Sequence, residues 1–252
     1  MPRPEPAYRR LLSEGGFPDR VRAAQAALQD CDLCAWACRV DRTQKIGFCR
    51  TGAEAIVSSA FPHMGEEDPL TGVHGSGTIF FALCNLRCQF CQNYEISQEG
   101  EGRISSVEEL AGLMLRLQAV GCHNINFVSP SHVIPPIIAA VHLAAEGGLS
   151  IPLVYNSGGY DSLAGLRLLD GIIDIYMPDA KYADPAVSAE LSGAADYPQR
   201  VRVALGEMYR QVGPLQLDER GIAVRGLLVR HLVLPEGLAG TARVMQFLAR
   251  LD

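Results

Sequence analysis

Three cysteines stand within eight residues, at Cys84, Cys88 and Cys91, directly behind the apolar run 78–83. A buried strand in that run would deliver all three thiols into one loop, where they form a set of soft metal ligands. A structural zinc site or a saturated iron–sulfur cluster normally takes four protein ligands, so three thiols leave one metal position open. The spacing C-x3-C-x2-C therefore predicts a site where a substrate or cofactor binds the metal.

The alternative for these thiols is a closed zinc loop that takes its fourth ligand from elsewhere in the chain. Cys122 or a histidine would complete such a site. The two interpretations differ in whether a fourth side chain reaches the metal.

An aromatic residue, Phe90, stands just before the last thiol, and C-x3-C-x-aromatic-C resembles the signature of the radical S-adenosylmethionine (SAM) superfamily. Segments 75–81 and 91–94 are similar to its PflX-type branch, relatives of the activating enzymes of pyruvate formate-lyase. The resemblance implies a [4Fe–4S] cluster on Cys84, Cys88 and Cys91, with SAM bound to the open iron. It also implies that one electron from a flavodoxin- or ferredoxin-type reductant cleaves SAM to methionine and a 5′-deoxyadenosyl radical, which abstracts hydrogen from a substrate.

A second cysteine group lies nearer the amino terminus, with the spacing C-x2-C-x3-C-x10-C at Cys31, Cys34, Cys38 and Cys49. Four thiols are a complete ligand set for one tetrahedral metal or one cubane, so no open position is expected there. We predict a second metal site. The spacing does not separate a structural zinc from an auxiliary [4Fe–4S] cluster that relays electrons.

Seven of the eight cysteines fall in these two groups, in a chain of 252 residues with no apolar leader at its start. This clustering favours metal ligation over disulfides. The apolar runs fall short of the roughly 20 residues that a membrane helix needs, so we expect a cytoplasmic protein with no membrane partner. A net charge of −6 and scattered basic residues argue against a nucleic-acid partner.

From residue 78 onward, strand-like runs alternate with amphipathic helices, which predicts an α/β fold of parallel strands with helices outside. The resemblance implies a partial (β/α) barrel of the radical SAM type with six β/α units, one more than the five strands that the sequence offers. We expect an N-terminal extension with the four-cysteine site at 1–75 and the barrel core at 76–252. The predicted strands are 78–83, 124–128, 152–156, 172–177 and 226–234.

Polar side chains follow the third and fourth predicted strands, at the edge where such folds place their active sites. Asn156 and Ser157 are similar to a Thr-Asn-Gly turn of the activating enzymes, which implies contact with SAM; an ordinary turn is the alternative. Met177, Asp179 and Lys181 are similar to a Met-x-Asp-x-Lys pattern that contacts SAM in those enzymes. A structural ion pair is the alternative for Asp179 and Lys181.

The second and fifth strands supply the remaining candidates. The family commonly has Gly-Gly-Glu after the second strand to bind the SAM amino group; this sequence has Ser129 and Ser131 there, and Ser131 alternatively caps the next helix. Arg230 stands among Leu and Val and therefore needs an anion, and it matches a family arginine. His231 points to the opposite face and is interpreted as a packed or capped histidine.

One polar group precedes the first strand. His63, Glu66 and Glu67 either form a polar wall facing a substrate or belong to a solvated turn between two prolines.

Three functions follow from these patterns. The first is a radical SAM enzyme that abstracts hydrogen from a glycine in a partner protein, which is the glycyl-radical activation implied by the PflX-type resemblance. The second is a radical SAM enzyme that modifies a small molecule or a peptide with the same cofactor residues. The third is a non-catalytic metal-binding or scaffold protein in which both cysteine groups hold zinc or inert clusters.

Overall fold

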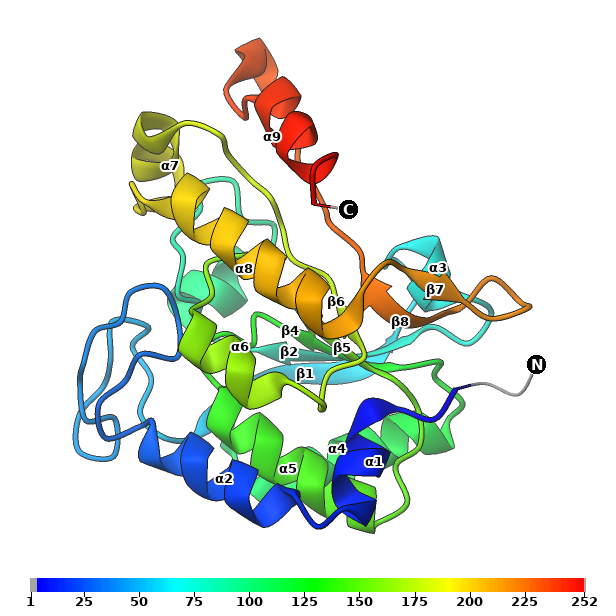
Figure 1. Ribbon diagram of the computed structural model, residues 1–252. Coiled ribbons are helices and arrows are strands. Elements are labelled where there is room, and N and C mark those ends of the chain that lie inside the picture. The colour runs from blue at the N-terminus through cyan, green and yellow to red at the C-terminus, as the bar shows by residue number, and fades with distance from the viewer. Residues whose placement is uncertain (1–3, 252) are drawn as a thin grey trace.

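The computed structural model describes residues 4–251, which form one open sheet of eight strands with helices packed against it (Figure 1). The strand order is β3-β1-β2-β4-β5-β6-β8-β7. The five central parallel strands are β2 (Ser76–Phe81), β4 (Ile125–Val128), β5 (Leu153–Asn156), β6 (Ile175–Tyr176) and β8 (Ala223–Leu227). The antiparallel strands are β1 (Ala55–His63) and β3 (Arg103–Ser105) on one side and β7 (Gln216–Leu217) on the other. The predicted α/β class is confirmed, and the sheet does not close on itself.

The five predicted strands all overlap the parallel strands, but the last one is displaced. It was expected at 226–234, and β8 is Ala223–Leu227. Beyond the end of β8, the parallel pairing with the segment after β6 continues as individual hydrogen bonds, such as that from Arg230 N to Pro178 O at 3.0 Å. One isolated β-bridge also joins Asp179 and Arg230. Pro178 has no N–H to donate, so the ladder between the two segments is interrupted there, and Ala180 N donates to Arg230 O at 2.8 Å beyond it.

The helices between the parallel strands share one apolar core with the sheet. They are α4 (Val107–Ala119), α5 (Ile134–Glu146), α6 (Leu163–Leu169) and α8 (Tyr197–Val212). The capping box before α4 is present: Ser106 Oγ accepts from Glu109 N, and Glu109 Oε2 accepts from Ser106 N. No side-chain cap precedes α5, so the interpretation of Ser131 as its N-cap is wrong.

The N-terminal helices are part of the same core. α1 (Ala7–Ser13) and α2 (Phe17–Ala26) pack against α5, and both Tyr8 and Phe17 are fully buried there. The backbone N–H of Ala7 donates to Asp174 Oδ1 at 2.7 Å, which joins α1 to the segment before β6. The predicted boundary between an N-terminal extension at 1–75 and a barrel core at 76–252 stays a prediction.

A second apolar cluster supports the cysteine-rich loops. It contains Leu86, Tyr160, Tyr182 and Tyr197 and is flanked by α7 (Pro185–Ser192), α8 and α9 (Thr241–Leu248). The short elements are α3 (Asp68–Thr71), the π-helix η1 (Glu95–Glu99) and the 3-10 turn η2 (Pro235–Gly237).

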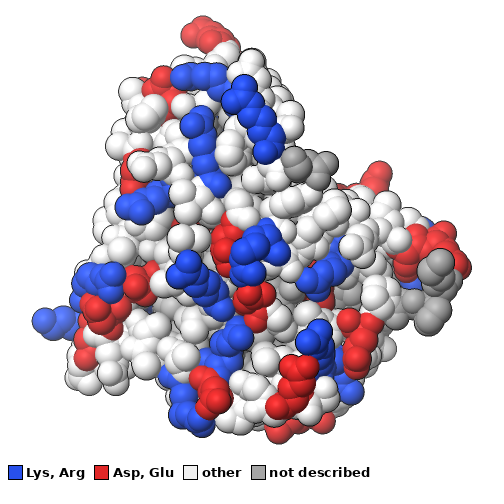
Figure 2. All heavy atoms as spheres, in the orientation of Figure 1, with Lys and Arg blue, Asp and Glu red and all other residues white. Residues whose placement is uncertain are grey.

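Two surface observations complete the description. None of the helices within residues 4–251 is long and apolar enough to cross a membrane. Figure 2 shows acidic and basic side chains interspersed over the visible face.

Candidate active site

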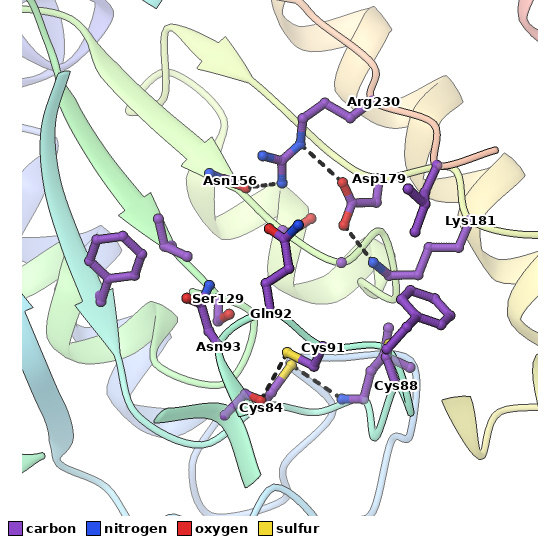
Figure 3. A pocket seen from close by; sticks show the side chains of 18 of the residues that line it. Cys84, Cys88, Cys91, Gln92, Asn93, Ser129, Asn156, Asp179, Lys181 and Arg230 are labelled. Carbon is purple, nitrogen blue, oxygen red and sulfur yellow. Dashed lines mark hydrogen bonds and ion pairs between the residues drawn. The ribbon is translucent and has the colours of Figure 1, made fainter. Parts of the chain in front are cut away.

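The three cysteines of the C-x3-C-x2-C motif follow the carboxyl end of β2 and line one cavity of about 620 Å³ (Figure 3). Leu83 turns the chain with a left-handed φ of 65°, and Leu86 anchors the loop in the second apolar cluster. The backbone N–H of Gln89 donates to the carbonyl of Leu191 in α7 at 2.9 Å. The loop is therefore fixed at both its start and its middle.

Each of the three sulfurs lies near a hydrogen-bond donor. The pairs are Leu86 N to Cys84 Sγ at 3.4 Å, Ser192 Oγ to Cys88 Sγ at 2.9 Å, and Ser97 Oγ with Cys91 Sγ at 3.1 Å. Donors directed at sulfur stabilise thiolates on iron and tune the potential of a cluster. Burial raises the pKa of Cys84 to about 11 and also raises that of Cys88, so metal binding must displace protons from these thiols.

Three thiols in one loop are suitable ligands for a cluster. Their side chains are not arranged around a common metal position in this structure. In the described part of the chain, no three Cys, His, Asp or Glu side chains are arranged as a ligand set.

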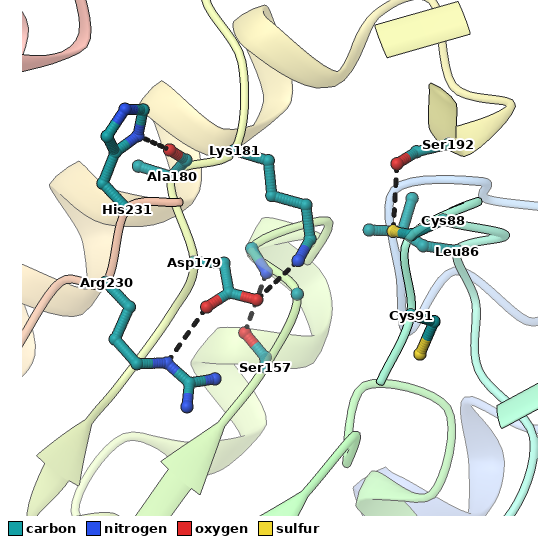
Figure 4. Close-up of polar contacts among 12 residues, drawn as sticks. Leu86, Cys88, Cys91, Ser157, Asp179, Ala180, Lys181, Ser192, Arg230 and His231 are labelled. Atoms are coloured by element: carbon teal, nitrogen blue, oxygen red, sulfur yellow. Dashed lines mark hydrogen bonds and ion pairs between the residues drawn. The ribbon is translucent and has the colours of Figure 1, made fainter. Parts of the chain in front are cut away.

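The opposite wall of the cavity carries charged groups centred on Asp179 (Figures 3 and 4). Lys181 Nζ donates to Asp179 Oδ2 at 2.6 Å, and Arg230 Nε donates to Asp179 Oδ1 at 3.0 Å. Burial favours the neutral acid, but the two cations outweigh it and hold the pKa of Asp179 below its usual value. Burial likewise opposes the charge on Lys181, yet Asp179 raises the pKa of Lys181 above its usual value. The ion pair lines the cavity, so it is placed to contact a bound ligand.

The other predicted cofactor residues are placed as follows. Asn156 lines the cavity, and its Oδ1 accepts from Arg230 Nη2 at 2.6 Å. Ser157, Ser129 and Phe90 also line it. Met177 does not: it is fully buried in a third apolar cluster with Leu70, Val154, Ile175 and Ala223.

His231 lies beside the cavity with both ring nitrogens engaged (Figure 4). Nδ1 contacts the carbonyl of Ala180 at 2.6 Å, and Nε2 contacts Thr241 Oγ1 at 2.9 Å. These contacts fit the predicted packing role.

The far end of the cavity is formed by His63, Glu66 and Glu67, which the sequence left open between a substrate wall and a solvated turn. Glu66 Oε2 lies 3.9 Å and Glu67 Oε1 lies 3.8 Å from Arg230 Nη1. Burial raises the pKa of Glu66 to about 7, against the lowering effect of Arg230. The structure therefore supports the interpretation of His63, Glu66 and Glu67 as a polar wall of the cavity.

Sequence reasoning missed four polar residues of the cavity: Gln92, Asn93, Ser97 and Gln98. Gln92 and Asn93 follow the last thiol directly, and Gln98 lies in η1. Their proximity to the motif was the only available signal, because no strand end carries them.

A closed zinc site that uses Cys122 does not fit this geometry. Cys122 precedes β4 and is packed near Gly77, at the amino ends of the parallel strands. The triad lies beyond their carboxyl ends, and Cys122 is not among the residues that line the cavity.

The second cysteine group lies apart from the cavity. Cys31, Cys34 and Cys49 are buried and Cys38 is partly buried. Cys34 forms an isolated β-bridge with Asp161, and Trp36 Nε1 donates to the carbonyl of Asn85 at 2.6 Å. The segment is thereby joined to the loops that follow β5 and β2.

Comparison with known proteins adds two findings. Residues 78–205, just over half of the chain, match the family model described as Radical SAM superfamily. "Uncharacterized protein MJ0674" of Methanocaldococcus jannaschii is 29% identical over 239 residues, which cover 92% of this chain and 65% of that protein. The chain thus spans less than two thirds of this relative. The family match contains the triad, Asn156 and the Asp179–Lys181 pair; Arg230 and the N-terminal thiols lie outside it.

Proposed function

The chain belongs to the radical SAM superfamily, and from this premise we propose that it cleaves SAM reductively and abstracts hydrogen from a substrate bound in the same cavity. The observation that carries the proposal is that the three thiols of one loop share a cavity with the Asp179, Lys181 and Arg230 array. The family implies a [4Fe–4S] cluster, which Cys84, Cys88 and Cys91 would hold, and SAM. When bound, the cluster supplies the electron that cleaves SAM to methionine and a 5′-deoxyadenosyl radical.

The protein side chains provide binding and orientation. Lys181 and Arg230 offer fixed positive charge for the carboxylate of SAM, and Asp179 holds both cations in place from opposite sides. Asn156 presents an amide beside them, and Ser157 is positioned by a hydrogen bond from its Oγ to Asp161 Oδ2 at 2.6 Å. Preorganised polar groups of this kind reduce the cost of orienting a charged ligand.

The experiment is anaerobic reconstitution with iron and sulfide, followed by dithionite and SAM. We expect release of 5′-deoxyadenosine. Cys88→Ala should abolish it together with iron binding at the triad, whereas Cys122→Ala, at the other end of the strands, should retain both. A protein that binds iron at the triad without cleaving SAM would reject the proposal.

For the substrate, we favour a glycine of a partner protein, as in glycyl-radical activation. The apolar rim of the cavity supports a polypeptide: Leu232 lines it and is 51% exposed, and the adjacent Val233 is 70% exposed. Peptides with deuterium on the glycine Cα should transfer it to 5′-deoxyadenosine.

A small molecule or peptide that carries a cationic group is the second candidate, because Glu66 and Glu67 form the far end of the cavity. Deuterium transfer from a labelled amine, with none from glycine peptides, would favour it over a partner protein. Arg230 competes with such a cation for both carboxylates.

A further inference from the structure

The N-terminal cysteine segment contains a buried cation without a carboxylate partner. Arg42 is only 2% exposed. Its donors reach neutral oxygens and one sulfur: Thr51 O at 3.3 Å, Thr51 Oγ1 at 2.7 Å, Gly52 O at 2.5 Å, His132 O at 2.7 Å and Cys31 Sγ at 3.8 Å. No ion pair of Arg42 with an acidic side chain occurs within residues 4–251. A buried, unpaired guanidinium is costly by several kcal/mol, so an anionic centre is expected beside it.

The thiols around Arg42 can provide that negative charge. Cys31 Sγ lies 3.8 Å from Arg42 Nη1, and Cys49 Sγ lies 3.0 Å from Thr51 Oγ1, the hydroxyl to which Arg42 Nη2 donates. A zinc ion and an iron–sulfur cubane both carry net negative charge once four thiolates bind them. Arg42 therefore suits a metal bound by this group, and it favours the more negative, reduced state of any centre that changes charge.

One side chain lies between this group and the catalytic triad. Asn85 is 2% exposed and directly follows Cys84, whose Sγ lies 3.8 Å from Asn85 Oδ1. Asn85 Nδ2 donates to the carbonyl of Tyr160 at 2.8 Å, which fixes its orientation. The same carbonyl accepts from the backbone N–H of Ala35, the residue after Cys34, at 3.2 Å, so neighbours of one thiol from each group meet at this carbonyl.

The backbone of this segment makes several contacts with the rest of the protein. Ala35 N donates to Tyr160 O at 3.2 Å, and Ser162 Oγ donates to Asp32 O at 2.5 Å. Together with the Cys34–Asp161 bridge, these contacts hold the segment against the loop after β5, and the hydrogen bond from Trp36 Nε1 to Asn85 O joins it to the loop of the triad. A zinc ion would tie down a segment that the backbone already fixes, whereas a redox centre would make use of the proximity of the two groups.

We propose that Cys31, Cys34, Cys38 and Cys49 hold a redox-active [4Fe–4S] cluster that passes single electrons across Asn85 to the cluster on Cys84, Cys88 and Cys91. The inference rests on the proposed function for its second cluster. A low-potential one-electron donor of the flavodoxin or ferredoxin class is oxidised by one electron. The N-terminal cluster takes up that electron and releases it to the catalytic cluster, with no bond formed or broken and no proton transferred at the relay.

The test is anaerobic reconstitution of the full chain with iron and sulfide, with zinc present as a competitor, followed by metal analysis and electron paramagnetic resonance of the reduced protein. We expect two cubanes per chain, no zinc, and two signals broadened by spin–spin interaction. One cubane with one zinc overturns the proposal, and so do two cubanes without broadening.

Four variants sharpen this test. Cys49→Ala should leave one cubane with an unbroadened signal, whereas Cys122→Ala should retain both clusters and the broadening. Arg42→Gln should shift the midpoint potential of the N-terminal cluster to more negative values, and Arg42→Lys should restore most of the shift. An unchanged potential in Arg42→Gln contradicts the assigned role of the buried cation.

These readouts do not require SAM cleavage, so the two proposals can fail separately. Two coupled cubanes without release of 5′-deoxyadenosine would reject the proposed function. Cleavage of SAM by a protein that holds zinc at the N-terminal thiols would reject the relay.

Discussion

The side chain of Arg230 contacts residues on two sides of the cavity. It donates to Asp179 Oδ1 and Asn156 Oδ1, and it lies near the carboxylates of Glu66 and Glu67. A planar guanidinium can hold several acceptors in fixed geometry, which an ammonium cannot. We therefore expect Arg230 both to bind a ligand carboxylate and to position the residues around it.

Replacement of Arg230 should weaken SAM binding without loss of iron. Arg230→Met removes charge-assisted hydrogen bonds that are each worth about 1.5–3 kcal/mol, so we expect the Kd for SAM to rise by about 10- to 100-fold. Equilibrium binding to the reconstituted protein measures this effect. Arg225→Met is the matched control, because Arg225 Nη2 bonds the carbonyl of Gln211 and Arg225 is not among the cavity residues. Equal affinity in both variants would contradict the assignment.

Glu66 should make stability depend on pH near neutrality. Its pKa is raised from 4.5 to about 7 in the folded protein, mainly by burial. A raised folded pKa means that the contribution to stability is complete below about pH 4.5 and is lost as the pH rises to about 7. The loss amounts to roughly 3 kcal/mol at most. Glu66→Gln should therefore gain stability relative to the wild type between pH 5 and pH 8 in urea denaturation; a constant difference across this range would refute the titration.

Some site residues could be predicted from sequence because they follow a single rule. The cysteines are adjacent in the chain, and Asn156 and Asp179 occupy the carboxyl ends of parallel strands. Glu66 enters from the connection between β1 and β2, an antiparallel pair to which the strand-end rule does not apply. Met177 shares the inward face with Asp179 but lies one layer lower, where residues such as Leu70 of α3 cover it.

At the scale of elements, α6 lies unusually close to the cysteine-rich segment. A Cβ on Gly165 would overlap the carbonyl oxygen of Leu33. The absence of a side chain at this helical position therefore allows the segment with Cys31 and Cys34 to lie on α6.

Gly165→Ala should separate these two elements. We expect a loss of about 1–3 kcal/mol in the free energy of unfolding, from overpacking, and reduced metal content at the N-terminal thiols with the triad cluster retained. Gly206→Ala is the control: Gly206 lies in α8 with open space around it, so the change should stabilise the protein by up to about 1 kcal/mol. Chemical denaturation and iron analysis test both variants. Full metal content in Gly165→Ala would show that the close approach is dispensable.

The parallel strands could be predicted because each is a compact apolar run, but β1 could not. Its register is interrupted between Val57 and Ser59, and Pro62 lies within it, so it shows neither clean alternation nor a continuous apolar run. The end of β8 depended on Pro178 in the neighbouring segment, which is a tertiary effect that the sequence of β8 itself does not contain.

At the scale of the whole molecule, the N-terminal helices and the sheet share one core, so they should unfold together. Phe17 is fully buried and stacks on His142 of α5 with ring centroids 4.8 Å apart. The single tryptophan, Trp36, lies in the cysteine-rich segment and reports on the N-terminal part separately from the helical signal of the whole chain.

Phe17→Ala should therefore destabilise the whole protein by about 3–5 kcal/mol. Under anaerobic conditions with bound metal, Trp36 fluorescence and far-ultraviolet circular dichroism should show coincident transitions in both wild type and variant. A fluorescence transition that shifts alone would instead support an independent unit at 1–75.

The open sheet has a functional consequence at the point where its two sides approach each other. Arg230 follows β8 and Glu66 and Glu67 follow β1, and their side-chain charges lie 3.8–3.9 Å apart, while Leu70 of α3 and Ala223 of β8 share an apolar cluster. Ion pairs at such distances contribute far less than a ladder of backbone hydrogen bonds. The contacts of Arg230 with the two glutamates are lost when an incoming ligand binds Arg230 in their place, and protonation of Glu66 removes one of them. Entry of a ligand between Arg230 and the two glutamates then requires the breaking of a few ionic contacts, while the strands and the apolar cluster of Leu70 and Ala223 stay in place.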